Sequence, residues 1–85
     1  MLKAGDRIRT TKLVPYGDTD YEGAIGTISI DTVGIVVGIY NKHGQNGCRV
    51  DFDESDENKQ DVLVLDYEMR PVSILELLAE ASDEN

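Results

Sequence analysis

Glycine, proline, asparagine and acidic residues divide this chain into short runs of β-forming residues. The clearest run, residues 48–53, alternates strictly between apolar and polar side chains. Cys48, Val50 and Phe52 would therefore point to one face of a strand and the polar residues to the other. Comparable runs rich in β-branched or aliphatic residues cover residues 7–14, 27–30, 33–40, 62–65 and 69–72. This pattern of short strands predicts a mainly β fold.

The segments between these runs have the composition of turns and loops. Pro15 is expected to end the first strand and to open a long first loop that extends to Gly26. Asn46-Gly47 is predicted to form a tight hairpin turn, because both residues tolerate a positive φ. Residues 54–60 are expected to form a charged loop, and residues 66–68 a single 3₁₀ turn before a short closing strand.

The sequence changes character at Ser73. Ser73 and Glu76 have the spacing of a capping box, and Ile74, Leu77, Leu78 and Ala81 would share one face of a helix. A helix of about nine residues is marginal on its own in water, so it is expected to dock. Docking on its own barrel is the favoured interpretation, and docking on a partner stays open. The predicted organisation is a β-barrel over residues 1–72 and a capped amphipathic helix with an acidic tail over residues 73–85.

The size and cysteine content restrict the class of protein. A chain of 85 residues is sufficient for one domain and buries only about 60% of its unfolded surface. Cys48 is its single cysteine, so no internal disulfide can brace it. No secretory signal or apolar stretch of membrane-spanning length is visible. These features predict a cytoplasmic protein without a membrane-bound segment.

The net charge of −9 is unevenly distributed along the chain. Residues 1–50 are nearly balanced, whereas residues 51–85 carry twelve acidic residues and only Lys59 and Arg70 as basic ones. An acidic chain of this kind argues against direct nucleic-acid binding, although Lys3, Arg7, Arg9 and Lys12 form a small basic cluster. The acidic second half instead favours a protein partner with a basic surface.

Four segments together carry a resemblance to known proteins. They are Gly5 to Arg9, Gly26 to Ile28, Gly34 to Ile39 and Arg49 to Asp53. Their order resembles the SH3-like barrel superfamily, and their spacing is similar to that of the small β-barrel accessory protein of photosystem I, the ferredoxin–thioredoxin reductase variable chain and KOW-type modules. The resemblance covers roughly residues 4–72. It implies a five-stranded SH3-like barrel with a long first loop, a 3₁₀ turn and a short C-terminal helix, acting as an accessory protein that docks on a larger one.

No set of residues predicts catalysis or metal binding. One cysteine and one histidine, Cys48 and His43, cannot supply the four ligands of a zinc site, and Cys48 shares the apparent core face of its strand. A calcium loop starting at Asp51 would need glycine and glutamate where the chain has Asp56 and Val62. We therefore expect no enzymatic activity, no metal and no cofactor.

The candidate binding residues lie in two segments, the first loop and the acidic segment after residue 50. Separately, Ser55 and Ser82 lie beside acidic residues and are candidate phosphorylation sites. Aromatic and acidic residues in the first loop would suit binding to another protein. Binding of a proline-rich peptide is a weaker alternative, because the chain lacks the tryptophan that such binding grooves use. The acidic segment after residue 50 would complement a basic surface on a partner protein. The alternative is that it is a solvated loop without a binding role. The predicted protein-binding residues are Tyr16, Asp18, Asp20, Tyr21, Asp51, Asp53, Glu54, Asp56 and Glu57.

The predicted function is therefore a small non-catalytic docking module that binds a larger protein through its long loop and acidic face. The main alternative is an acidic nucleic-acid mimic, in which spaced carboxylates occupy the phosphate-binding groove of a DNA- or RNA-binding protein. An enzyme or a component of an enzyme complex is a third interpretation, supported only by the occasional use of the fold in enzymes. The identity of the partner and the oligomeric state are left open by the sequence.

Overall fold

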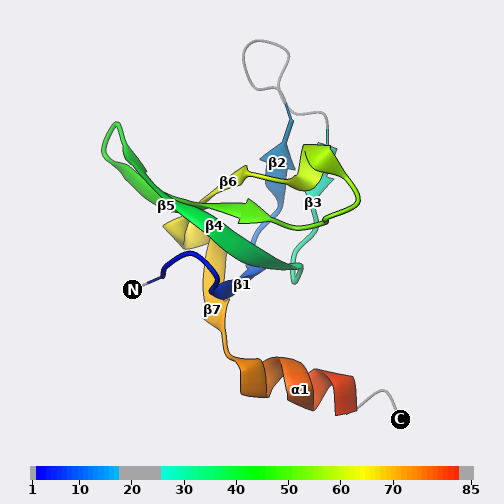
Figure 1. The fold of residues 1–85 in the computed structure, drawn as a ribbon. Coiled ribbons are helices and arrows are strands. Elements are labelled where there is room, and N and C mark those ends of the chain that lie inside the picture. Colours follow the sequence, from blue (N-terminus) through cyan, green and yellow to red (C-terminus); the bar gives the residue numbers. More distant parts are fainter. Residues whose placement is uncertain (1, 18–25, 83–85) are drawn as a thin grey trace.

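Within the described part of the chain, seven strands form the body of the protein and one helix follows them (Figure 1). The computed structural model describes residues 2–17 and 26–82. The strands are β1 (Arg7–Thr10), β2 (Val14–Tyr16), β3 (Gly26–Ile28), β4 (Val33–Lys42), β5 (Gln45–Asp51), β6 (Val62–Leu65) and β7 (Met69–Val72). Two 3₁₀ turns, η1 (Glu57–Lys59) and η2 (Asp66–Glu68), flank β6, and the helix α1 covers Ile74–Ser82.

Five of the strands form one antiparallel sheet in the order β6-β5-β4-β1-β7, and β2 pairs with β3 in a separate two-stranded sheet. The first and last strands of the chain are therefore neighbours, with Arg7 opposite Val72 and Thr10 opposite Met69. The prediction of a mainly β chain is confirmed. The two sheets are not joined into a closed barrel in the part of the chain that the structure describes, so a closed five-stranded barrel stays a prediction.

The core lies between the two sheets. The predicted alternation is confirmed over residues 48–50, because Cys48 and Val50 are buried and Arg49 between them is exposed, whereas Phe52 lies beyond the end of β5 and is half-buried against the core. Among the described residues, Arg9 and Thr10 are polar but buried, and the Thr10 hydroxyl both donates to Ser29 O (2.7 Å) and accepts from Thr32 N (2.9 Å). The buried apolar residues are Ile8, Val14, Ile28, Val36, Cys48, Val50, Val62, Val64, Met69 and Val72.

The hairpin between β4 and β5 turns at His43-Gly44 and not at Asn46-Gly47. Asn41 pairs with Asn46, and His43 and Gly44 both have positive φ, 55° and 76°. Gly47 has a different role, since a Cβ there would lie 2.3 Å from Val64 O on the neighbouring strand β6. The prediction of a turn at Asn46-Gly47 was wrong because His43-Gly44 has turn chemistry as well. The pairing of β4 with β5 places the turn at His43-Gly44.

The first loop is also shorter than predicted. Residues 7–14 do not form one strand, since β1 ends at Thr10 and Val14 already belongs to β2. Pro15 lies inside β2, opposite Thr27, and does not end a strand. Proline is tolerated there because this sheet has only two strands, so its missing N–H can face away from the partner strand.

The C-terminal elements agree with the sequence patterns. The 3₁₀ turn η2, the closing strand β7 and the helix α1 all lie where they were predicted. Ser73 Oγ accepts from Glu76 N at 3.1 Å, which is the N-cap half of the predicted capping box. None of the helices in the described residues is long and apolar enough to cross a membrane.

Candidate functional site

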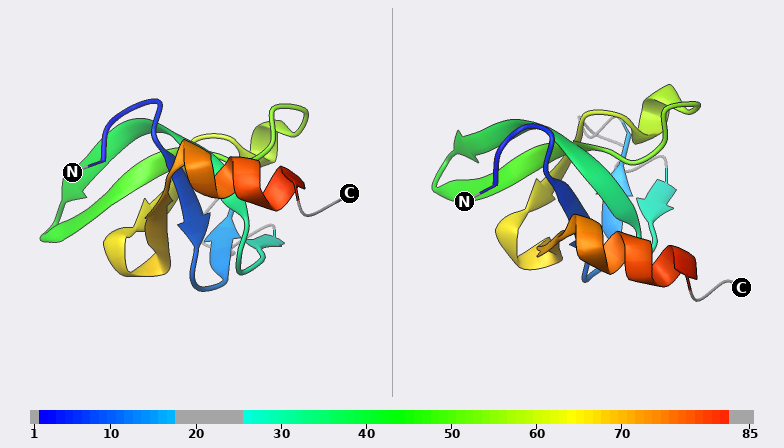
Figure 2. Two further views of the ribbon diagram at one scale, coloured as in Figure 1. Left: turned by 90° about the horizontal axis from the view of Figure 1, so that it is seen from below. Right: turned by 60° about the horizontal axis from the view of Figure 1, so that its bottom comes forward.

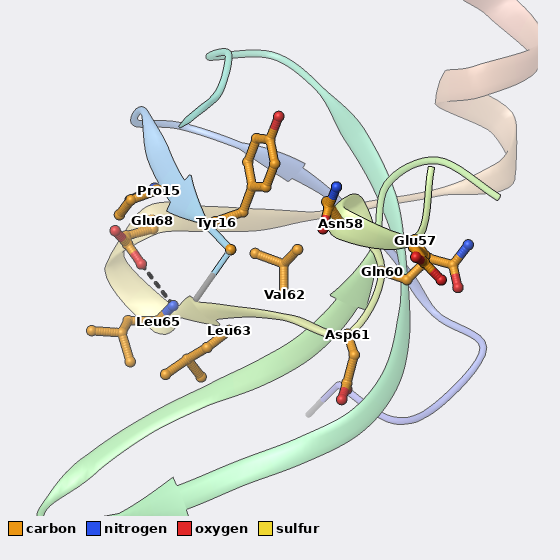
Figure 3. Close-up of a pocket in the computed structure, with 11 residues that line it drawn as sticks. Pro15, Tyr16, Glu57, Asn58, Gln60, Asp61, Val62, Leu63, Leu65 and Glu68 are labelled. Carbon is orange, nitrogen blue, oxygen red and sulfur yellow. Dashed lines mark hydrogen bonds between the residues drawn. The ribbon is translucent and has the colours of Figure 1, made fainter. Parts of the chain in front are cut away.

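A groove of about 630 Å³ runs between β2, η1, β6 and η2 (Figure 3). Its apolar lining comes from Pro15 and Tyr16 on β2 and from Val62, Leu63 and Leu65 on β6. Figure 3 shows Val62 pointing toward the Tyr16 side of the groove. Two strands that are distant in sequence thus supply a surface on which an apolar side chain could be buried.

Acidic and amide groups surround this apolar lining. Glu57 and Asp61 lie at the η1 end of the groove and Glu68 at the η2 end, together with Asn58 and Gln60. The charges are partly offset, because Asp61 Oδ1 lies 3.2 Å from Arg49 Nη1. Lys59 Nζ stands over the Tyr16 ring, 5.9 Å from its centroid, in a cation–π contact. The three carboxylates would favour a positively charged ligand.

The backbone of β6 contributes hydrogen-bonding groups to the same region, because β6 is an edge strand of the main sheet. Leu65 N donates to Glu68 Oε1 at 2.9 Å, so this N–H points away from β5. In an antiparallel pair such orientation repeats every second residue, which places the N–H and C=O of Leu63 on the outer edge as well. An extended segment from another molecule could pair with this edge.

A second hollow of about 340 Å³ lies beside β4 and the end of β5. Phe52 and the predicted binding residues Asp51, Asp53 and Glu54 line it, together with Arg7. The predicted acidic residues are therefore not one cluster, since Glu57 lines the groove beside β6 and Asp51 the hollow beside β4.

Three of the predicted acidic residues shape their own loop. Asp51 Oδ1 accepts from Asp61 N at 2.7 Å, and Asp56 Oδ1 caps η1 by accepting from Asn58 N at 3.0 Å. Asp53 Oδ1 accepts from both the hydroxyl (2.7 Å) and the backbone N (2.9 Å) of Ser55, and these bonds lower the pKa of Asp53. Hydrogen bonding therefore holds these three carboxylates in place, and at Asp53 it favours the charged form.

The predicted binding residues of the first loop divide into two groups. Tyr16 lies in the groove, as a docking residue would, whereas Asp18, Asp20 and Tyr21 lie outside the described residues. The sequence did not single out Leu63 and Leu65 as binding residues. The sequence showed that residues 62–65 are all apolar, but only the strand order places β6 at the edge of the sheet, where part of that apolar surface is exposed.

The two residues considered for nucleophilic chemistry, Cys48 and His43, lie in different parts of the β4–β5 hairpin. Cys48 is buried in the core, where burial raises the pKa of its thiol, with Asp66 and Asp6 adding to the effect. His43 lies in the turn between β4 and β5. Over residues 2–17 and 26–82, no three His, Cys, Asp or Glu side chains are grouped to hold a metal ion.

Comparison with known proteins found no match among protein families, curated proteins or solved structures. The functional argument therefore rests on the geometry of the groove.

Proposed function

We propose that this protein is a non-catalytic docking module of the cytoplasm, which binds a larger protein through the groove between β2 and β6. The observation that carries the proposal is the combination of an apolar lining and three carboxylates with the edge strand β6, on which the N–H and C=O of Leu63 face outward. The preferred ligand is an extended segment in which an aliphatic residue lies next to lysine or arginine. Main-chain pairing with Leu63 would supply affinity, and the side-chain contacts would supply specificity.

We further propose that the two sheets form an SH3-like bent barrel. The adjacency of β1 and β7, the 3₁₀ turn before β7 and the separate β2–β3 pair support this arrangement. In such an arrangement the groove lies at the open side between β2 and β6. This is consistent with a docking role for a surface that the core does not need for its own packing.

A selection experiment tests the docking proposal. Random heptapeptides are selected against the full chain, and binding of the enriched sequences is measured by NMR titration at 50 and 500 mM NaCl. We expect an aliphatic residue next to a basic one, amide shifts centred on Val62 to Leu65, and weaker binding at high salt. Tyr16→Ser should reduce affinity about tenfold, since burial of one aromatic side chain is lost.

The matched control is Tyr67→Ser, which removes an exposed tyrosine on η2 from outside the groove. Equal binding by the Tyr16→Ser variant, or a consensus without basic residues, would contradict the proposal. The alternative function, an acidic nucleic-acid mimic, is favoured by the hydrogen bonds that hold Asp51, Asp53 and Asp56. It would predict a nucleic-acid-binding partner whose affinity is unchanged by Tyr16→Ser. Binding of that partner should be abolished when Asp51, Asp53, Asp56 and Glu57 are neutralised together.

A further inference from the structure

The helix α1 is oriented opposite to the usual arrangement of an amphipathic helix. Its acidic residues, Glu76 and Glu80, lie one turn apart and face the sheet. Ile74 and Leu75, on the other side of the helix, are 55% and 78% exposed. A surface helix normally buries its apolar side and exposes its charges. In the left view of Figure 2, which shows the molecule from below, α1 (orange) lies in front of the strands, next to β1 (blue).

Two arginines of the sheet explain this orientation. Arg9 on β1 and Arg70 on β7 are directly opposite each other, and paired like charges destabilise a sheet unless an anion lies between them. Glu76 supplies the anion for Arg70, with N–O distances of 2.9 and 3.2 Å. Arg9, whose side chain is only 11% exposed, donates from Nη2 to Glu80 Oε1 at 2.6 Å, and its Nε lies 3.6 Å from Glu76 Oε2. The sheet therefore selects the acidic side of α1.

We propose that α1 is a docking helix, held by its acidic side on Arg9 and Arg70 so that Ile74 and Leu75 are presented to an apolar groove with a basic rim on a partner protein. This surface is distinct from the groove between β2 and β6, and the proposal does not depend on that groove. Binding of an amphipathic helix in a groove is a common mode of recognition. Because ion pairs attach α1 to the sheet, Ile74 and Leu75 are not needed to pack against it and stay exposed.

Area and charge decide between a partner protein and a second copy of the chain. Burying Ile74 and Leu75 against another α1 would cover roughly 100–250 Å² per copy, far below the roughly 800 Å² per partner of a standard interface. Two chains of net charge −9 would also repel each other. A groove that encloses the helix covers more surface, and lysine or arginine at its rim would complement the net negative charge of this chain.

Site-specific crosslinking tests this proposal with the full chain. A photoreactive phenylalanine analogue replaces Leu75, or Leu13 as an exposed control on another part of the molecule, in cells that make the protein. The crosslinked protein is then purified separately and its affinity for the unmodified chain is measured. We expect the crosslink to map to an apolar groove flanked by basic residues. Leu75→Asp should weaken binding about tenfold or more, and Leu13→Asp should not.

Three outcomes would overturn the proposal. They are a crosslink between two copies of this chain, a yield at position 75 no higher than at position 13, and an unchanged affinity of the Leu75→Asp variant. Far-UV circular dichroism of both variants verifies that α1 and the sheet are retained. Because Tyr16 lies on β2 and Leu75 on α1, failure of the groove proposal and failure of the helix proposal give different results.

Discussion

Gly47 illustrates how one residue can satisfy a local rule and serve a tertiary role. Asn46-Gly47 has strong turn chemistry, yet both residues lie in β5 and the chain turns at His43-Gly44. Gly47 is required because β6 approaches too closely for a side chain, with Val64 O only 2.3 Å from where a Cβ would be. Sequence patterns cannot distinguish these roles, since the approach of β6 depends on residues that are distant in the chain.

At the residue scale we predict that Gly47→Ala destabilises the fold and Gly44→Asn does not. The new methyl group at position 47 would contact backbone atoms, which cannot rotate away, so a loss of about 1–3 kcal/mol in the free energy of unfolding is expected. Position 44 has a φ of 76° and open space around it, and asparagine tolerates this conformation. Urea denaturation measures both variants. Equal stability of the wild type and Gly47→Ala would show that β6 is not held close to β5.

Arg9 shows the same dependence on distant residues. Its sequence neighbours suggested a basic cluster able to contact phosphate, but its side chain is largely buried and engaged with Glu76 and Glu80. Its Nη1 also donates to Asp31 O at 3.1 Å. The chemistry of an arginine thus follows from which carboxylates the fold brings to it.

At the element scale, α1 is attached to the sheet by charge. The boundaries of the helix were predictable, because Ser73 is an N-cap residue and the following residues favour a helix. The side of the helix that faces the sheet was not. The periodicity of Ile74, Leu77 and Leu78 identifies an apolar side, but the paired arginines on β1 and β7 are visible only once the strands are aligned.

The attachment of α1 is expected to weaken in acid. Hydrogen bonds from Arg70 lower the pKa of Glu76 below its ordinary value of 4.5. A group whose pKa is lowered by folding stabilises the fold above its ordinary pKa, and this contribution is lost as the pH falls through the lowered value. The wild type should therefore exceed Glu76→Gln in stability at pH 7, and the difference should vanish below the lowered pKa.

Urea denaturation of both proteins from pH 7 to pH 3, with hydrogen exchange of the α1 amides, measures this effect. Asp53→Asn is the control, because Asp53 also has a lowered pKa but binds Ser55 in the loop before η1. It should change the pH dependence of unfolding without changing exchange in α1. A wild-type advantage over Glu76→Gln that is independent of pH would contradict the role of the Glu76 charge.

At the scale of the whole molecule, the two sheets enclose one apolar core and leave several charged edges. The alternation of residues 48–52 predicted the inward residues of β5, and Val62 and Val64 of β6 join them in the core. The acidic segment after β5 was predicted as one face. The structure instead divides it between two hollows and uses three carboxylates as hydrogen-bond acceptors within the loop.

Cys48 should report on the integrity of the entire core. It is 2% exposed, and burial raises the pKa of its thiol above the ordinary value of 9.0. Labelling by a thiol reagent should therefore require opening of the sheet. If opening costs about 5 kcal/mol, at the low end for a small domain, labelling would be slowed roughly a thousandfold or more relative to the unfolded chain.

The matched control places an exposed cysteine at position 55, as Ser55→Cys in a Cys48→Ala background. This variant should react at nearly the rate of the unfolded chain. Labelling of Cys48 as fast as that of the control would show that β5 is not held in a closed core.

The sequence by itself determined the mainly β character, the positions of β6 and β7, the second 3₁₀ turn and the limits of the helix, because these depend on alternation, turn residues and caps within a few positions of each other. The tertiary structure decided the turn of the β4–β5 hairpin, the edge position of β6, the grouping of Tyr16 with β6 and the orientation of α1. Each of these depends on pairing between segments far apart in the chain. Strand register brings Arg9 opposite Arg70 and Gly47 against β6, and local sequence patterns carry no information about register.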